Sequence, residues 1–522
     1  MKIALVYKAF EFFTFEIFST MLKKRGHNVR LFFFPSLFDD YSIRSKRLAK
    51  IFSEESSILK DIEDFAPDML FFSITTDSLV WNNKIARSLR ETLKDSIFLA
   101  GGAHPTIIGK EFLKRYPFYD LAVRGMGDEA IISLSLEKSY EDIKGLIYKK
   151  DEKIIENDWQ VLPDKKFLDT IPDKELFYKK MPFLRKYHTT FAQYGCNYRC
   201  SFCIHSSLKK EKKYSIKTRD IHIIIEELED AKKRGSKYVI FYDDDLLSDN
   251  IFAKKLLNIY KEKIGLPFIC ITHPLSASED MIRLLKSSGC IGVEIGTQII
   301  DETIRKEVLN RFEDDNSIKN ALSLFKDHNI PTTVDHIIGI PGETFEKHIK
   351  SLFFYKKNKA SRVLISYLTA YPGITLNDIL LEKGIIDKEK LLKIEAGDVD
   401  NYQFHGSLEL NSRFYSLEAL FEWLPFLSTN LIKKLSNILK RKELILPKII
   451  TKYIPFFICG LFYRHELNLR IFIKKYAYFV GKKIIDKLTF VMKLDFGFWE
   501  NQTDPNPESQ PPNPDSLKGV SK

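Results

Sequence analysis

The chain has 522 residues, 44% of them apolar, a length that allows two or three domains, each with its own core. Its six cysteines, three of them clustered, fit a reducing cytoplasm better than a secreted, disulfide-linked protein. The first residues lack the cleavage site of a signal peptide, and no uncharged apolar run reaches the roughly 18 residues of a spanning helix. We therefore expect a cytoplasmic protein without a spanning helix, in which the distribution of the net charge of +11 matters more than its size.

Residues 1–140 are predicted to form a doubly wound parallel sheet, because short apolar strands alternate with amphipathic helical stretches. We expect strands at 3–7, 29–34, 69–74, 97–100 and 121–123. Ligands of such sheets bind at the carboxyl ends of the strands. The loops there either make only tight turns or let the backbone approach a large ligand closely. Their small, hydroxyl and polar residues are Ser73, Thr75, Gly101, Gly102, His104, Gly125, Gly127 and Glu129.

Residues 141–185 are predicted to connect this domain to the next one. Two short β-rich runs flank a turn at 150–152 and indicate a small hairpin. Pro163, Pro172 and Pro182 then indicate an extended crossing.

From residue 186 to about 380 the alternation of strands and helices restarts. Strands are expected at 189–194, 238–242, 268–272, 292–295, 333–338 and 362–367. Six strands over this length fit a partial (β/α)6 barrel of the TIM type. Such a barrel carries its functional residues at the C-terminal ends of the strands.

Cys196, Cys200 and Cys203 follow the first of these strands with C-x3-C-x2-C spacing. A [4Fe–4S] cluster normally takes four cysteine ligands, so three thiolates in one loop would leave one iron open to another ligand. Zinc is the alternative, with His205 as a candidate fourth ligand. Zinc sites usually close with four ligands from two paired half-sites, however, and no second C-x2-C or H-x3-H follows. A disulfide explains the motif less well, because three is an odd number.

Phe202 completes the pattern C-x3-C-x-aromatic-C, which resembles the signature of the radical S-adenosylmethionine (SAM) enzymes. The resemblance implies that the open iron binds the amino and carboxylate groups of SAM. It also implies reductive cleavage of SAM to methionine and a 5′-deoxyadenosyl radical, with an electron donor such as flavodoxin or ferredoxin.

Further loops at the ends of the barrel strands resemble SAM-binding loops of this family. Asp243 and Asp244 begin an acidic trio after the second strand, although Asp there could equally cap a helix. Glu294 ends the fourth strand, and a Gly-Ile-Pro-Gly loop ends the fifth. The residues implied to bind SAM are Phe202, Asp243, Asp244, Glu294, Gly339, Pro341 and Gly342.

The loops of residues 1–140, taken in order, resemble the cobalamin-binding domain that precedes many radical SAM domains. The resemblance implies that the eight loop residues named above contact cobalamin, with His104 expected to hold its loop by hydrogen bonds. The Asp-x-His-x-x-Gly element of other cobalamin folds is absent from residues 8–13. The cobalamin would then bind without a histidine on its lower face, or the domain would be empty and vestigial.

Residues 381–500 show helical periodicity, and basic residues dominate between 433 and 493, interleaved with aromatic runs. This composition favours peripheral contact with the inner face of an anionic membrane. The alternative is a helical lid over the barrel, which would have the same apolar content. Because no RNA-binding module is recognisable, we expect no nucleic acid partner. The Pro-rich tail 501–522 is too polar to fold alone.

The resemblance implies a cobalamin-dependent methyltransferase that acts on an unactivated carbon of a small molecule, for example a lipid or a secondary metabolite. The alternatives are a radical SAM oxidase, cyclase or isomerase with a vestigial cobalamin domain, and a non-catalytic iron–sulfur or zinc protein. The sequence identifies no catalytic side chain.

Overall fold

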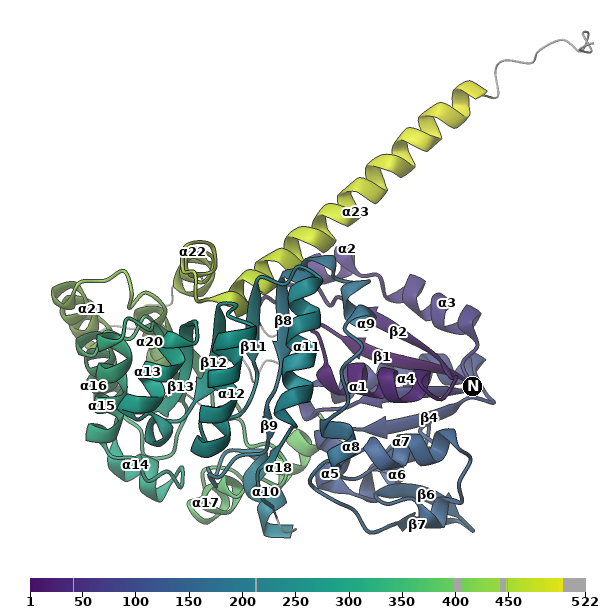
Figure 1. Cartoon of the computed structure of the whole chain (residues 1–522), viewed down its shortest axis with the longest axis horizontal. Coiled ribbons are helices and arrows are strands. Elements are labelled where there is room, and N and C mark those ends of the chain that lie inside the picture. Colours follow the sequence, from purple (N-terminus) through teal and green to yellow (C-terminus); the bar gives the residue numbers. More distant parts are fainter. Residues whose placement is uncertain are drawn as a thin grey trace, which may run out of the picture. The chain divides into compact units, whose positions relative to one another are not determined.

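The computed structural model describes residues 1–40, 42–211, 214–398, 406–408, 410, 412–441, 447 and 449–500. Residues 1–475 form one unit and residues 476–522 a second. The predicted tail 501–522 and residues 442–446 and 448 of the basic segment lie outside the described residues. Figure 1 shows the sheets and helices of the first unit in chain order.

The N-terminal sheet has the order β2-β1-β3-β4-β5-β6-β7. Its parallel strands are β1 (Lys2–Lys8), β2 (Asn28–Phe34), β3 (Met69–Ser73), β4 (Ile97–Gly101) and β5 (Leu121–Val123). The predicted hairpin is present as β6 (Leu146–Lys150) and β7 (Lys153–Glu156), and β6 pairs antiparallel with β5. The hairpin therefore extends this sheet.

Both faces of the sheet are covered, as in a doubly wound fold. Ala4 and Val6 share a hydrophobic cluster with residues of α3 and α4, and neighbouring Ile3 and Leu5 are equally buried on the alternating side of the strand. The helices are α1 (Phe13–Lys23), α2 (Lys46–Phe52), α3 (Glu55–Phe65), η1 (Thr76–Ser78), α4 (Leu79–Thr92), α5 (Ala103–Ile108), α6 (Glu111–Arg115), α7 (Asp128–Ser135) and η2 (Tyr140–Asp142).

Short helical turns connect the two sheets. They are α8 (Lys165–Leu168), α9 (Glu175–Tyr178) and η3 (Pro182–Lys186), in which Pro182 stands at the first position. The Asp173 N–H donates to the Glu16 carbonyl at 3.1 Å, and Arg219 Nε donates to the Leu168 carbonyl at 2.7 Å. The connector is thus hydrogen-bonded to α1 on one side and to the second sheet's domain on the other.

The second sheet is parallel, with the order β15-β14-β13-β12-β11-β8. Its strands are β8 (Tyr187–Thr190), β11 (Tyr238–Phe241), β12 (Phe268–Thr272), β13 (Cys290–Gln298), β14 (Thr332–Ile338) and β15 (Arg362–Tyr367). Among the described residues no pairing joins β8 to β15, so the barrel is open. The predicted α/β fold class, with a doubly wound Rossmann-like domain before a partial (β/α)6 barrel, is confirmed.

The predicted strand 189–194 is two strands. After β8, the Asp243 carboxylate accepts the N–H groups of Ala192 (2.9 Å) and Gln193 (2.6 Å). These bonds take the backbone out of the parallel ladder. β9 (Gln193–Tyr194) then pairs antiparallel with β10 (Lys217–Thr218).

Helices follow the barrel strands, and several begin at an Asp or Thr whose side chain caps the first turn, as Asp249 and Thr344 do. They are α10 (Ile204–Glu211), α11 (Ile221–Lys233), α12 (Asn250–Lys263), η4 (Pro274–Ser276), α13 (Glu279–Ser287), α14 (Glu302–Glu307), α15 (Asp315–Asp327) and α16 (Phe345–Lys357). The apolar faces of α11, α12, α13, α15 and α16 share one large core with the strands.

The C-terminal region is helical, as predicted. Its elements are α17 (Leu376–Glu382), α18 (Lys388–Glu395), α20 (Ser412–Glu422), α21 (Thr429–Arg441), the π-helical turn η5 (Ile449–Tyr453), α22 (Ile454–Phe462) and α23 (Leu467–Glu500). Leu417 and Phe421 of α20 and Ile432 of α21 are buried in the barrel core, so these helices belong to the barrel. No helix among the described residues is long and apolar enough to span a membrane.

Candidate functional site

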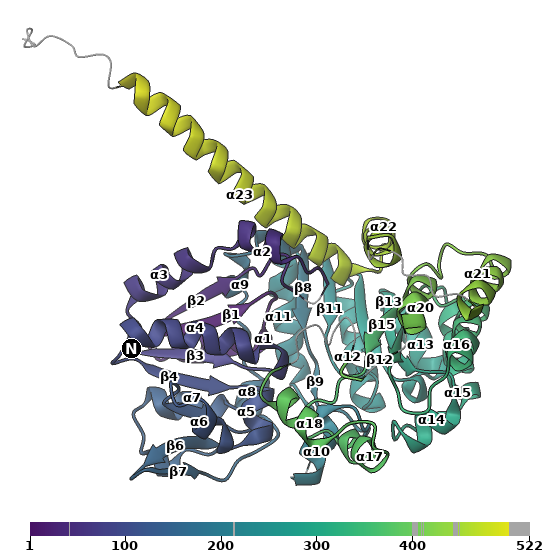
Figure 2. The same ribbon diagram turned by 180° about the vertical axis from the view of Figure 1, so that it is seen from behind.

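The cysteine loop leaves β9 at the carboxyl edge of the barrel. All six cysteines are free thiols. The Cys203 N–H donates to the Cys200 carbonyl at 3.0 Å, and Lys209 Nζ donates to the carbonyls of Cys196 and Tyr198. The Leu376 N–H, at the start of α17, donates to the Ser201 carbonyl at 3.0 Å, and Figure 2 shows α17 beside α10, which follows the loop. The loop is therefore held on both sides.

The three thiols are a donor set suited to an iron–sulfur cluster. Burial raises the pKa of Cys196 to about 11 and that of Cys203 to about 12, and it also raises the pKa of Cys200. Each thiol therefore keeps its proton until a cation binds. Among the described residues, no group of three or more His, Cys, Asp or Glu side chains is placed around a single metal ion. The fit to an iron–sulfur cluster rests on the donor set itself, because such a cluster takes one thiolate at each iron and the loop supplies three.

Arg311 is the basic side chain beside this loop, and the sequence analysis missed it. Its Nη1 lies 3.7 Å from Cys200 Sγ, and its Nη2 donates to the Gly296 carbonyl at 2.7 Å and contacts His273 Nε2 at 2.8 Å. Its Nε donates to Glu313 at 2.5 Å. Arg311 follows α14 in a loop without a recognisable motif, so no local signal could have found it.

The acidic trio after β11 divides into two buried carboxylates and one that is half exposed. Burial raises the pKa of Asp243, whose oxygens accept backbone N–H groups, to about 7. Asp245 accepts hydrogen bonds from Ser276 (2.6 Å) and Thr272 (2.8 Å). Asp244 is the member that lines the large cavity described below. The alternative of a helix cap at the trio is wrong, because Asp249 caps α12.

The remaining SAM candidates lie apart from that cavity. Glu294 lines a separate space of about 30 Å³ beside Glu466, and burial raises its pKa. The N–H groups of Gly339 (2.9 and 2.8 Å) and Ile340 (2.7 Å) donate to the Glu343 carboxylate. Pro341 is buried and Gly342 is exposed, with no atom within 4 Å of a Cβ added at Gly342. Phe202 packs against the apolar cluster that contains Ile340.

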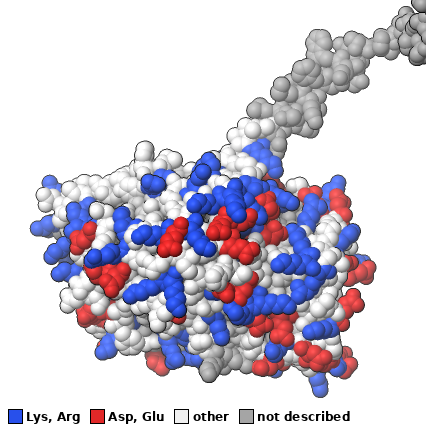
Figure 3. Space-filling model, in the orientation of Figure 1, with Lys and Arg blue, Asp and Glu red and all other residues white. Residues whose placement is uncertain are grey.

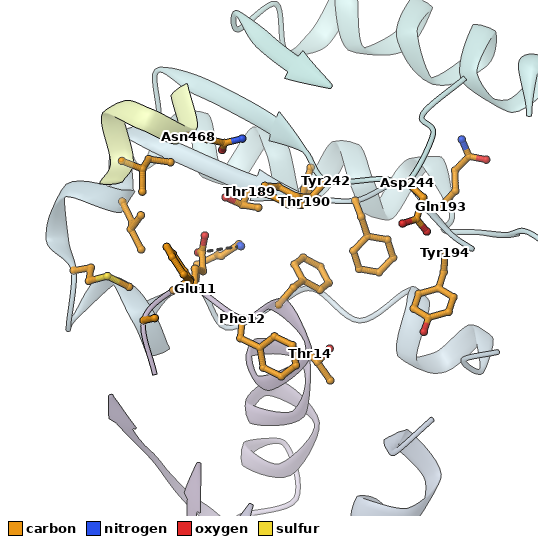
Figure 4. Close-up of a pocket in the computed structure, with 18 of the residues that line it drawn as sticks. Glu11, Phe12, Thr14, Thr189, Thr190, Gln193, Tyr194, Tyr242, Asp244 and Asn468 are labelled. Atoms are coloured by element: carbon orange, nitrogen blue, oxygen red, sulfur yellow. Dashed lines mark hydrogen bonds and ion pairs between the residues drawn. The ribbon is translucent and has the colours of Figure 1, made fainter. Parts of the chain in front are cut away.

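Two cavities meet at the carboxyl edges of the two sheets. The larger, called the chamber below, has a volume of about 620 Å³ and is lined from both domains and from the start of α23. The smaller, of about 270 Å³, lies at the N-terminal sheet. Figure 4 shows the chamber. Both cavities are lined by Phe12, Thr14, Tyr194 and His205. The two cavities therefore adjoin each other beside the cysteine loop, because Tyr194 lies two positions before Cys196.

Five of the eight cobalamin candidates line the smaller cavity, namely Ser73, Gly101, Gly102, Gly125 and Gly127. A Cβ at Gly101 would meet no protein atom within 4 Å, which leaves room for a ligand against its backbone. Gly102 has φ +102°, and a Cβ there would lie 2.8 Å from the backbone of Ile74. Gly101 thus leaves room for a large ligand that approaches the backbone closely, whereas Gly102 is required by close packing within the protein.

The other three candidates are not among the residues that line this cavity. Thr75 forms a capping box with Ser78. His104 is buried, its Nδ1 is 3.1 Å from Thr76 Oγ1, and burial lowers its pKa to about 4, so it is neutral and holds its loop. Glu129 pairs with Lys144 at 3.5 Å.

Comparison with known families identifies both halves of this arrangement. Residues 191–354 match the family model of the radical SAM superfamily, and residues 14–135 match that of the B12 binding domain. The chain is a radical SAM protein with an N-terminal B12-binding domain. It is therefore an enzyme whose cofactors are a [4Fe–4S] cluster, SAM and cobalamin, as the sequence predicted.

Its relatives have different reactions. The radical SAM protein is 25% identical over 343 residues to an uncharacterized methyltransferase of Pyrococcus horikoshii, a match that covers 63% of this chain and 73% of the relative. It is 23% identical over 314 residues to the anaerobic magnesium-protoporphyrin IX monomethyl ester cyclase of Cereibacter sphaeroides, covering 55% of this chain and 49% of the cyclase. The chain thus spans about half the length of the cyclase, and these relatives leave its own reaction open.

Solved structures agree with the fold. The methyltransferase TsrM of Kitasatospora setae, with tryptophan and a SAM analog bound, matches with a TM-score of 0.60 and 17% identity over 73% of this chain and 76% of TsrM. The cobalamin-dependent radical enzyme OxsB, with aqua-cobalamin and SAM bound, matches with a TM-score of 0.56 and 14% identity over 97% of this chain and 82% of OxsB.

Proposed function

We propose that the protein is a cobalamin-dependent methyltransferase that methylates an unactivated carbon of a small molecule such as a lipid or a secondary metabolite. The observation that carries this proposal is the common boundary of the two cavities. Phe12 and Thr14 of the N-terminal domain and Tyr194 and His205 beside the cysteines line both. A substrate in the chamber would therefore adjoin the cofactors of both domains.

Each domain has a role in this proposal. Residues 1–140 hold cobalamin, residues 186–380 form the radical SAM core, residues 381–500 complete the barrel, and the connector 141–185 joins the first two. Cys196, Cys200 and Cys203 ligate the cluster, and Asp244 is the SAM candidate that faces the chamber. When bound, the cluster and SAM supply hydrogen-atom abstraction at carbon, and cobalamin supplies a methyl carrier. Phenyl groups on the chamber wall exclude water from the reacting atoms.

The test uses the full chain, reconstituted anaerobically with iron, sulfide and cobalamin and supplied with methyl-labelled SAM, a reductant and extracts of the source cells. We expect 5′-deoxyadenosine and one labelled product. Gly101→Phe should fill the smaller cavity and abolish corrinoid retention and methyl transfer. Cys200→Ala should abolish formation of both 5′-deoxyadenosine and the labelled product. SAM cleavage without corrinoid retention by the parent would contradict methyl transfer and favour an oxidase, cyclase or isomerase.

The electron that this proposal needs would come from a donor such as flavodoxin or ferredoxin.

We also infer peripheral contact of residues 433–493 with an anionic membrane. Several apolar side chains of α21, η5 and α22 are 40–75% exposed, namely Leu431, Ile438, Ile449, Ile450, Ile454, Leu461 and Phe462. Lys433 and Lys434 of α21 are exposed near them in sequence. Figure 3 shows Lys and Arg across the whole face with Asp and Glu among them, so this face has no separate basic patch. The inference of membrane contact therefore rests on the exposed apolar residues.

Co-sedimentation with vesicles tests the membrane contact. The protein should bind vesicles that contain phosphatidylglycerol at low salt and release them at high salt, since surface charge is screened within a Debye length. Phe462→Ser should weaken binding, whereas Ile251→Ser, at a side chain that is 72% exposed on α12, should not. Failure of the parent to bind anionic vesicles would remove the inference.

A further inference from the structure

The chamber has two polar ends and an aromatic middle. In Figure 4, Glu11 and Asn468 lie toward one side, Gln193, Tyr194 and Asp244 toward the other, and Tyr242 between them. The wall is dominated by phenylalanines, which are Phe10, Phe12, Phe13, Phe167, Phe191 and Phe472. A ligand that spans this space must be mostly apolar, with its polar group at one end.

Both lysines of the chamber wall are neutralised by carboxylates. Lys174 is 4% exposed, and its Nζ lies 2.8 Å from Glu16 Oε2 and 3.3 Å from Glu11 Oε1. Lys475 is 2% exposed, and its Nζ lies 3.0 Å from Asp40 Oδ2 and 3.3 Å from the Ala9 carbonyl. Neither ammonium is therefore available to bind an anionic ligand.

Two carboxyl groups contact Lys174, and Glu11 is the one open to the chamber. Glu16 is fully buried, and burial raises its pKa well above its usual range, so Glu16 favours the neutral form, whereas Glu11 is 11% exposed and pairs with the ammonium. Glu11 lines the chamber and Glu16 does not. At the opposite end Asp244 is 47% exposed, with His205 Nε2 at 3.0 Å. The chamber thus presents hydrogen-bond acceptors at both ends.

We propose that the chamber selects a mostly apolar substrate whose head group donates hydrogen bonds, a hydroxyl or an amine, and that Glu11 determines this specificity. The inference rests on the proposed function for the identity of the substrate cavity. A carboxylate or phosphate head group beside Glu11 would be desolvated next to a like charge, which disfavours binding. Fatty acids and lipid phosphates are therefore excluded, and neutral or cationic amphiphiles fit.

Glu11 stands in the segment after β1, where other cobalamin folds have the Asp-x-His-x-x-Gly element. In this chain the segment instead supplies Phe10, Glu11, Phe12 and Phe13 to the chamber wall. This segment therefore lacks the histidine that could bind cobalt and forms part of the chamber wall instead.

The test is calorimetric binding of three probes with one alkyl chain, octylamine, 1-octanol and octanoate, to the anaerobically reconstituted holoenzyme near neutral pH. Octylamine, which is protonated there, should bind at least about tenfold more tightly than octanoate. Glu11→Gln should weaken octylamine by about tenfold and leave 1-octanol within about twofold. Glu111→Gln is the matched control, because Glu111 is a surface residue paired with Lys114.

Octanoate binding as tightly as octylamine would overturn the proposal, as would an unchanged amine preference in Glu11→Gln or no binding of any probe. Iron and corrinoid contents of each variant verify that the holoenzyme is intact. These binding results are independent of methyl transfer. Loss of the labelled product with the amine preference intact would refute the proposed function alone, and the reverse would refute the inference alone.

Discussion

Replacing Arg311 should lower the reduction potential of the cluster. Arg311 Nη1 lies 3.7 Å from Cys200 Sγ, and the side chain is 5% exposed. At an effective dielectric constant of about 20, unit charges at this separation interact by about 4 kcal/mol. The added electron is spread over the cluster and Glu313 opposes the arginine, so we take about half of this energy. About 2 kcal/mol corresponds to about 90 mV for one electron.

The assay is an anaerobic redox titration of Arg311→Gln, followed by electron paramagnetic resonance. The midpoint should become more negative, because the reduced cluster loses a nearby cation. Arg311→Lys keeps the charge and should remain nearer to the parent. Arg311→Gln also leaves the buried Glu313 without its partner, so we expect lower thermal stability as well. A midpoint within about 20 mV of the parent, or a higher one, would refute the electrostatic reasoning.

Three further predictions test the site and its support. Alanine at Cys196, Cys200 or Cys203 should abolish bound iron, whereas alanine at Cys270, Cys290 or Cys459 should retain it; normal iron in Cys200→Ala would contradict the ligand assignment. Gly102→Ala should destabilise the protein by about 2–3 kcal/mol, because φ is +102° and the new Cβ would lie 2.8 Å from the Ile74 backbone. Gly26→Ala, with φ +82° and no atom within 4 Å, should cost about 1 kcal/mol, and equal shifts in melting temperature would argue against the clash. Burial raises the Asp243 pKa to about 7, so the folded state binds this proton more tightly than the unfolded chain, and stability falls as pH rises toward that value. Asp243→Asn should flatten this dependence of the melting temperature on pH, and an unchanged slope would show that Asp243 is not its source.

The sheets were predictable because their signals are local. β1 is a continuous apolar run with Ile3, Ala4, Leu5 and Val6 fully buried, as expected for a strand covered on both faces. The break between β8 and β9 was not predictable, because Asp243 makes it from 50 and 51 residues away. The apolar pattern of a strand does not indicate where a distant side chain will replace a backbone hydrogen bond between strands.

The site divides in the same way. The cysteine spacing is local and predicted the cluster loop. Arg311 stands 111 residues after Cys200, so only the fold brings it to the thiol. In the loop after β11, Asp243 and Asp245 are buried and Asp244 lines the chamber. Asp243 and Asp244, which were predicted together as SAM ligands, therefore lie in different environments. The part of the chamber wall at Asn468 and Lys475 was also missed, because the helical periodicity there does not indicate what the helix covers.

The contact between Lys475 and Ala9 has a consequence for biosynthesis. The two residues are 466 positions apart, and the N-terminal domain is made first. At about 5–20 residues per second, the ribosome needs roughly 20 to 90 seconds to add the rest of the wall. Until then α23 does not cover the phenylalanine segment after β1, so a nascent chain exposes this apolar surface to solvent. A chaperone or a cofactor that binds during translation would meet this segment before the enzyme is complete.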